Sequence, residues 1–236
     1  MVSKRRVRRS LFAEISSGVQ AMRDHREGRV DLRAHHIESQ AAAFETLRED
    51  RRLEVRTYQL RITLMETEPP IWRRLLVPGN TTLRRLDRII QTAMGWTNSH
   101  LHTFTAGGVL YADSHAEWEI DVKDERRVRL ESIAKQEGEA LVYEYDMGDS
   151  WRHQVLVEEV RWGDSDGPVC LSGERACPPE DCGGVQGYYD TLEILRSPRH
   201  DEYEHTKTWI ESMTGGPFDP AVFDLNAVNA ALNALR

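Results

Sequence analysis

Cysteine is scarce in this chain. Three cysteines occur among 236 residues, and an odd number cannot pair completely into a disulfide framework. No two of them are spaced C-x-x-C, so the usual zinc knuckle is excluded. No apolar run approaches the roughly 20 residues of a membrane-spanning helix, and no apolar segment follows the basic N-terminus as in a secretory signal. These absences predict a cytoplasmic protein with reduced thiols and no membrane partner.

Signatures of several common enzyme classes are also missing. The sequence has no G-x-x-x-x-G-K-[ST] loop to hold nucleotide phosphates and no H-E-x-x-H helix to hold zinc. No histidine is followed three residues later by arginine, a pair that a tyrosine recombinase normally requires. These absences favour a non-enzymatic protein. The alternative is a metal-dependent enzyme that uses a cluster of histidine and aspartate side chains.

Charge is distributed unevenly. The formal net charge is −8, but residues 1–53 carry 12 basic and 8 acidic side chains, a net of +4, whereas the remainder carries 19 and 31, a net of −12. The acidic body argues against a general nucleic-acid-binding surface but is compatible with a local basic patch. The basic excess lies in an N-terminal arm that contains Lys4, Arg5, Arg6, Arg8 and Arg9. Such an arm is typical either of a phosphate-binding segment or of a solvated tail.

The N-terminal part of the chain has helix signals and no strand signals. Apolar residues recur at helical spacing over 11–22 and again over 37–47, and a charged break follows at 48–52. We therefore predict a short, basic, helical extension over 1–53, which would serve for partner docking or self-association. The main domain is expected to cover 54–236.

The main domain has strand signals first and helix signals late. Alternating patterns predict strands near 58–65, 71–78, 101–106, 109–112, 140–146 and 151–162. Apolar residues at helical spacing predict helices near 83–94, 188–196, 201–212 and 224–235. Thr81 or Thr82 is expected to cap the first of these helices, and Gly95 to end it. Because β-α-β alternation is absent, this order predicts an α+β fold with a mainly antiparallel sheet and packed helices.

Two polar clusters have residue types that suit metal binding or acid–base chemistry. Residues 145–153 read Y-D-M-G-D-S-W-R-H and bring two aspartates and a histidine to one turn, whereas residues 99–104 read S-H-L-H-T-F and put two histidines on one side of a strand. Imidazole and carboxylate groups bind divalent metals and transfer protons. The alternative is that the aspartates only stabilise the turn and the histidines only pack. The candidate metal ligands are His100, His102, Asp149 and His153.

A further segment, at 177–189, reads C-P-P-E-D-C-G-G-V-Q-G-Y-Y. Cys177 and Cys182 are five residues apart, which is wider than zinc knuckles favour. The two prolines stiffen the approach, and Gly183 and Gly184 permit positive φ or close backbone contact. The segment therefore predicts a rigid structural loop, with a ligand-binding loop as the alternative.

Together these stretches resemble a known family. The hallmarks are Pro70-x-Trp72-Arg73, Gly95-Trp96, His100-Leu101-His102-x-Phe104, Tyr145-Asp146-x-Gly148-Asp149-x-Trp151-x-His153 and Pro178-Pro179-Glu180-Asp181-x-Gly183-Gly184. Over about residues 56–235 the chain resembles the plasmid pRiA4b ORF-3-like family. The resemblance implies a compact α+β domain from bacteria or archaea, often associated with plasmids or insertion elements, for which no catalytic residues are established. Residues 11–38 are similar to the N-terminal arm of some helix-turn-helix antitoxins and regulators, but no helix-turn-helix follows.

Three functions are compatible with these features. The leading hypothesis is a non-enzymatic, mobile-element-associated binding or regulatory protein with an unknown protein or nucleic-acid partner and no cofactor. Its recognition pocket would comprise Trp72, Trp96, His102, Asp146, Asp149, Trp151, His153, Glu180 and Asp181. The alternatives are a hydrolase that uses a divalent metal on the four candidate ligands, and a DNA-binding regulator that acts through the basic arm.

Overall fold

The computed structural model describes residues 19–20, 22–29, 56–116, 118, 120–163 and 167–235. The chain divides into two compact units, Met1–Arg48 and Glu49–Arg236. In the first unit, residues 19–20 and 22–26 are helical. The helix predicted over 37–47 and the basic arm both lie outside the described residues.

The second unit is an α+β domain. In chain order its elements are β1 (Arg56–Leu64), β2 (Ile71–Pro78), α3 (Leu83–Met94), β3 (His102–Ala106), β4 (Val109–Ala112), β5 (Lys123–Asp124), the 3₁₀ helix η1 (Glu125–Arg127), α4 (Leu130–Ile133), β6 (Ala140–Tyr145), β7 (Trp151–Trp162), β8 (Val169–Glu174), α5 (Gly184–Arg196), α6 (Tyr203–Thr214) and α7 (Leu225–Asn233). The strands form one eight-stranded sheet in the order β5-β4-β3-β6-β7-β1-β2-β8. Only the β4–β5 pair is parallel among these described strands. The predicted α+β fold with a mainly antiparallel sheet is confirmed.

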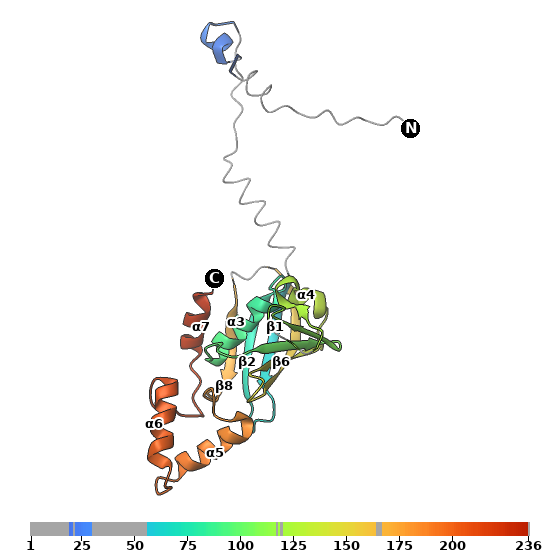
Figure 1. Ribbon diagram of the computed structural model, residues 1–236. Coiled ribbons are helices and arrows are strands. Elements are labelled where there is room, and N and C mark those ends of the chain that lie inside the picture. Colours follow the sequence, from blue (N-terminus) through green and yellow to red (C-terminus); the bar gives the residue numbers. More distant parts are fainter. Residues whose placement is uncertain are drawn as a thin grey trace. The chain divides into compact units, whose positions relative to one another are not determined.

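Alternation along the central strands gives the sheet one buried face. Tyr58, Leu60, Ile62 and Leu64 of β1 are each at most 1% exposed, as period-2 packing requires. Helix α3 lies against the sheet (Figure 1) and contributes its apolar stripe to the same core. The side chains of opposite parity on β1 and β2 form the other face.

Local signals fix the ends of α3. The Thr82 side chain accepts a hydrogen bond from the Arg85 amide at the N-terminus. At the C-terminus Gly95 adopts the left-handed conformation with φ 97°, which glycine reaches without strain. This helix places the following segment, which contains Trp96 and His100, at one end of the sheet.

Among the late helices, α7 packs against the β8 edge of the sheet, and α5 and α6 pack against each other. Helix α7 contacts both β8 and α3, and α5 contacts α6 (Figure 1). Asp224 caps α7 as predicted, accepting bonds from the amides of Asn226 and Ala227. Helix α5 begins earlier than the predicted 188, directly after the left-handed Gly183. Among the described residues, no helix is both long and apolar enough to cross a membrane.

Candidate functional site

The loop between β8 and α5 is fastened to two other loops. The Glu180 carboxylate accepts hydrogen bonds from the Tyr145 hydroxyl (2.6 Å), the Thr97 amide (3.0 Å) and the Thr97 hydroxyl (2.6 Å). The Trp96 indole N–H donates to the Pro178 carbonyl at 2.9 Å. Burial alone would raise the pKa of Glu180, but the bonds from Thr97 and Tyr145 outweigh it, so the pKa is lowered and the carboxylate is charged.

Glycines bring the same loop against its neighbours. A Cβ on Gly184 would lie 2.6 Å from the Asp149 carbonyl oxygen, and Gly184 has φ 69°. A Cβ on Gly187 would lie 1.9 Å from the Cys182 carbonyl oxygen, too close for any side chain. Asp149 itself accepts a hydrogen bond from the Gly183 amide at 3.1 Å. These contacts agree with the rigid loop that the sequence predicts at this segment.

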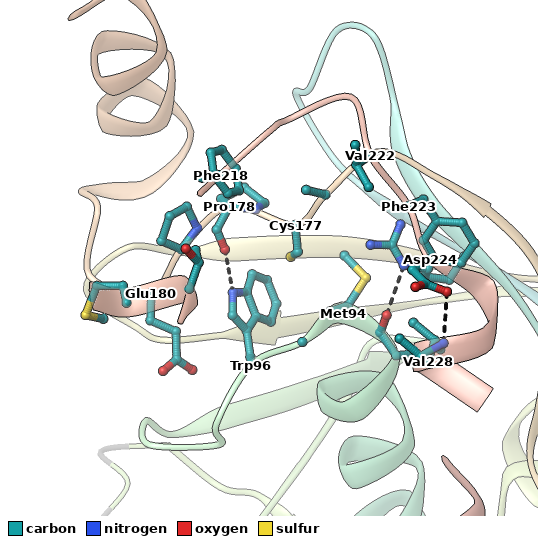
Figure 2. Close-up of a pocket in the computed structure, with 18 of the residues that line it drawn as sticks. Met94, Trp96, Cys177, Pro178, Glu180, Phe218, Val222, Phe223, Asp224 and Val228 are labelled. Carbon is teal, nitrogen blue, oxygen red and sulfur yellow. Dashed lines mark hydrogen bonds between the residues drawn. The ribbon is translucent and has the colours of Figure 1, made fainter. Parts of the chain in front are cut away.

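A pocket of about 360 Å³ lies beside this loop. Its walls are mostly apolar and come from α3, the 176–180 segment, the α6–α7 connection and α7, as Figure 2 shows. The apolar side chains around it include Met94, Trp96, Cys177, Phe218, Val222, Phe223 and Val228. Two acids, Glu180 and Asp224, also line it, and both already accept hydrogen bonds from other groups.

Arg73 is the cationic residue that lines this pocket. It comes from β2 and is 3% exposed. Its Nε donates to the Ala93 carbonyl at 2.9 Å, and its Nη1 donates to the carbonyls of Trp72 (2.9 Å) and Glu174 (3.0 Å). Its Cζ lies 4.4 Å from the centroid of the Phe223 ring, a cation–π distance.

The Arg73 charge has no carboxylate partner among the residues that the structure describes. The three carbonyls, one of them at the negative C-terminal end of α3, supply only partial charges. No described residue accepts a hydrogen bond from Nη2. Burial therefore lowers the pKa of Arg73, and interactions with Cys177 and Cys170 offset this only in part. The pocket thus has a buried positive charge that a negative ligand group would complement.

The cysteines of the loop are protonated thiols at neutral pH. Burial raises the pKa of Cys177 far above its ordinary value, with a smaller opposing effect of Arg73. Burial also raises the pKa of Cys182 to about 12, and the nearby Asp149 adds to the shift. Since the thiolate is the form that attacks a substrate, neither side chain is activated as a nucleophile.

His102 is held in a buried network beneath α3. Its Nδ1 lies 3.2 Å from Asp87 Oδ1, and its Nε2 lies 2.7 Å from Glu125 Oε2. Arg84 donates to the other oxygen of Glu125 at 3.0 Å, and the Tyr143 hydroxyl donates to Asp87 at 2.8 Å. Both ring nitrogens thus face carboxylates of the protein, and the contacts of His102 tie β3 to α3 and η1.

His153 lies within the aromatic core. It is fully buried, and its ring centroid is 5.2 Å from that of Trp96 and 5.5 Å from that of Tyr143. Neither ring nitrogen has a hydrogen-bond partner of normal geometry among the described residues. Burial lowers its pKa to about 4, so the imidazole is neutral at pH 7. The sequence correctly places His153 on one strand face with Trp151 and Val155, but that face is the interior.

The third histidine, His100, has a different environment. Its Nε2 lies 3.1 Å from Asp181 Oδ1 and 3.7 Å from Asp146 Oδ2. These three ligand-type atoms lie within 4.8 Å of one another. The four candidate ligands proposed from the sequence therefore have separate surroundings: His100 faces two aspartates, His102 two other acids, Asp149 a backbone amide and His153 aromatic rings.

The residues predicted to form one recognition pocket also lie in different parts of the domain. Trp96 and Glu180 line the 360 Å³ pocket, and Trp151 is buried behind Trp96 with ring centroids 5.9 Å apart. Trp72 has the parity of the other sheet face, where Arg61 and Arg74 stack on its ring with Cζ distances of 4.7 and 5.2 Å. The structure thus brings two of the three tryptophans together and places the third elsewhere.

A hydrolase-like pattern also occurs in the chain. Residues 163–167 read G-x-S-x-G, the pattern of a nucleophile elbow. That elbow joins a strand to a helix, whereas this segment lies between the antiparallel strands β7 and β8. Ser165 lies outside the described residues. The structural context of the elbow is therefore missing.

Sequence reasoning did not single out Arg73 as a pocket residue. A signal was available, because Ile71, Arg73, Leu75 and Val77 share one parity on β2 and the other three are typical core residues. An arginine on the buried face of a strand needs a compensating partner. Asp181, by contrast, was expected at the pocket, but no pattern linked it to His100.

The fold and this loop-bordered pocket define an α+β domain built on a single, mainly antiparallel sheet. Residues 56–227 match the family described as plasmid pRiA4b ORF-3-like protein, and the chain belongs to this family. The chain is 36% identical over 179 residues to the uncharacterised protein y4hQ of Sinorhizobium fredii (strain NBRC 101917 / NGR234), covering 75% of this chain and 91% of that protein.

A solved structure shares the fold. The crystal structure of the protein of unknown function MM3350 from Methanosarcina mazei Go1 matches with a TM-score of 0.63 and 34% sequence identity. The match covers 73% of this chain and 96% of the archaeal one. The predicted family is therefore confirmed, and the match with MM3350 spans nearly all of that chain.

Proposed function

We propose that this protein is a non-enzymatic binding or regulatory protein whose main domain takes up a small, largely apolar molecule with one anionic group. The ligand would occupy the 360 Å³ pocket between α3, the 176–180 segment and the α6–α7 connection. The observation that carries the proposal is the buried Arg73 guanidinium, which lines an apolar pocket without a carboxylate partner among the described residues.

The size and the walls of the pocket support a small organic ligand. Sites for such ligands usually have volumes of about 300 to 1,000 Å³, with apolar walls and a few polar groups that fix orientation. Two apolar residues of its lining, Met213 and Val222, are 43% and 56% exposed. A bound molecule that covered these side chains would gain hydrophobic free energy in proportion to the area removed from water.

The charges in the pocket favour an anion over a cation. The carboxylates of Glu180 and Asp224 are engaged by Thr97, Tyr145 and the first amides of α7, so neither is left to bind a cation. Arg73 still has Nη2 donors without a described acceptor. The two Nη2 hydrogens can donate charge-assisted hydrogen bonds to a carboxylate.

The side chains of the pocket support binding rather than catalysis. No histidine or lysine is among the described residues that line it. Its thiol, on Cys177, is kept protonated because burial raises the pKa. We place this binding function in a regulatory context of the kind that the family resemblance implies, associated with plasmids or insertion elements.

The test measures carboxylate binding by calorimetry and ligand-observed NMR. Hexanoate and phenylacetate are compared with hexanamide and phenylacetamide, which have the same apolar parts without the charge. We expect the carboxylates to bind more tightly, and Arg73→Met to weaken their binding by about 10- to 100-fold, since a hydrogen bond to a charged group contributes about 1.5–3 kcal/mol. Arg73→Lys should retain part of the affinity.

The matched control is Arg61→Met. Arg61 also stacks on an aromatic ring, that of Trp72, but has the parity of the opposite sheet face. Its removal should leave carboxylate binding unchanged. Equal binding of acids and amides, or equal carboxylate affinity in the wild-type protein and in a folded Arg73→Met variant, would contradict the proposal.

A further inference from the structure

Three loops bring a histidine and two aspartates together outside the pocket. His100 precedes β3, Asp146 follows β6, and Asp181 precedes α5. His100 Nε2 lies 3.1 Å from Asp181 Oδ1 and 3.7 Å from Asp146 Oδ2, and the three atoms lie within 4.8 Å of one another. Among the described residues, this is the set of histidine, cysteine and acidic side chains whose spacing suits a metal ion.

The spacing is close to that of an occupied coordination sphere. Ligand bonds of about 2.0–2.2 Å place neighbouring ligand atoms about 2.8–3.6 Å apart in octahedral or tetrahedral geometry. The 3.1 Å separation falls in this range and the 3.7 Å separation slightly above it. The Asp146 and Asp181 oxygens lie within 4.8 Å of each other, so small shifts of the side chains would bring the three atoms to ligand spacing.

Hydrogen bonds from backbone amides orient Asp146 and the loop that contains Asp181, as neighbouring groups usually orient metal ligands. Asp146 Oδ1 accepts hydrogen bonds from the amides of Gly148 (2.9 Å) and Asp149 (3.3 Å), which leaves Oδ2 facing His100. The Asp149 carboxylate in turn holds the Gly183 amide, two residues after Asp181. The turn after β6 and the loop before α5 are thus fixed relative to each other without using the three candidate ligand atoms.

The atoms that face one another are not satisfied by protein groups. Asp146 is only 8% exposed, yet no described residue donates a hydrogen bond to its Oδ2. His100 Nε2 is buried and has no hydrogen bond of normal geometry, although Asp181 Oδ1 is 3.1 Å away. No described lysine or arginine pairs with either aspartate. A cation placed between the two carboxylates and the unpaired ring nitrogen would complement all three atoms.

We propose that His100, Asp146 and Asp181 form a binding site for one divalent transition-metal ion. The mixed nitrogen and oxygen donors favour zinc or manganese, whereas magnesium and calcium prefer oxygen ligands alone. Three protein ligands leave further coordination positions to water. The ion would link the segment before β3, the turn after β6 and the loop before α5, and the site does not depend on the anion-binding pocket.

The experiment uses the untagged full chain after dialysis against a chelator. Zn²⁺, Mn²⁺ and Mg²⁺ are titrated by calorimetry, and bound metal is counted by mass spectrometry after desalting. We expect one Zn²⁺ or Mn²⁺ per chain and much weaker Mg²⁺ binding. His100→Ala and Asp181→Asn should each lower the affinity at least about tenfold, the lower end of the loss when even outer-sphere partners are removed. Asp181 is largely exposed, so its amide variant should fold.

The control is His115→Ala. His115 is also near an aspartate, with Nδ1 3.4 Å from Asp113 Oδ1, but Arg126 rather than a second acid completes that cluster. Since the chain has nine histidines, this variant separates the site from adventitious histidine binding. Metal binding that His115→Ala leaves intact and both site variants weaken supports the proposal. Absence of stoichiometric binding, or equal affinity in Asp181→Asn and wild type, overturns it.

Discussion

Replacing His153 by phenylalanine should make the protein less sensitive to acid. His153 is fully buried among aromatic rings, and burial lowers its pKa from 6.5 to about 4. Because the folded-state pKa is depressed, the unfolded chain binds a proton at a pH where the folded protein does not. The contribution of the neutral His153 to stability is therefore present above about pH 6.5 and is lost as the pH falls toward 4.

The magnitude follows from the two pKa values. One pKa unit corresponds to about 1.4 kcal/mol. With pKa values of 6.5 unfolded and about 4 folded, the free energy of unfolding should fall by about 2 kcal/mol between about pH 7.5 and pH 5 through this group. Over the whole range the loss would reach about 3 kcal/mol. His153→Phe retains a ring against Trp96 and Tyr143 but does not titrate.

The assay is urea denaturation of the wild-type protein and the His153→Phe variant at several pH values. The quantity of interest is the change in the free energy of unfolding with pH, because the substitution also alters packing at every pH. We expect the pH slope of the variant to be smaller by the amount above. His205→Phe, which removes an exposed histidine on α6, is the control. Parallel curves for wild type and His153→Phe would refute the assignment of a neutral, buried imidazole.

Two further predictions concern the loop between β8 and α5. Gly184→Ala should lower the free energy of unfolding by about 2–4 kcal/mol, because it combines a residue at φ 69° with a Cβ 2.6 Å from a carbonyl oxygen. Gly138→Ala measures the cost of the backbone conformation alone, since Gly138 has φ 85° and a Cβ there would meet nothing within 4 Å. Similar losses of stability in the two variants would show that the close contact at Gly184 adds no cost. Glu180→Gln should cost about 1–2 kcal/mol in thermal or urea unfolding, since an amide nitrogen cannot accept the Thr97 hydroxyl bond. An unchanged stability would contradict the anchoring role of Glu180.

The fold was largely predictable because its signals are local. Alternation on β1, the Thr82 cap and the Gly95 stop of α3, and the Asp224 cap of α7 each depend on a few neighbouring residues. Strand order was not predictable in this way, since it depends on which strands meet after the chain has folded back. The start of α5 differed from the prediction because the left-handed Gly183 starts the helix directly after the loop.

The candidate site was predictable only in part. The sequence indicated that the loop at 177–189 is rigid, because proline fixes φ and glycine permits positive φ and close backbone contact whatever the tertiary structure. It also indicated His100, Asp146 and Asp181 as polar residues of interest. It did not indicate that these three side chains face one another, because they lie on loops far apart in the chain.

His100, His102 and His153 show most clearly which properties follow from the sequence and which follow from the tertiary structure. The sequence by itself indicated that His102 and His153 lie on strands, but it also put His100 on the strand of His102, whereas β3 begins only at His102. Only the tertiary structure decided that His102 is enclosed by Asp87 and Glu125, that His153 is buried among rings, and that His100 faces two aspartates. The physical reason is that the chemistry of an imidazole depends on the charges and water around it, and those come from residues that are distant in the chain.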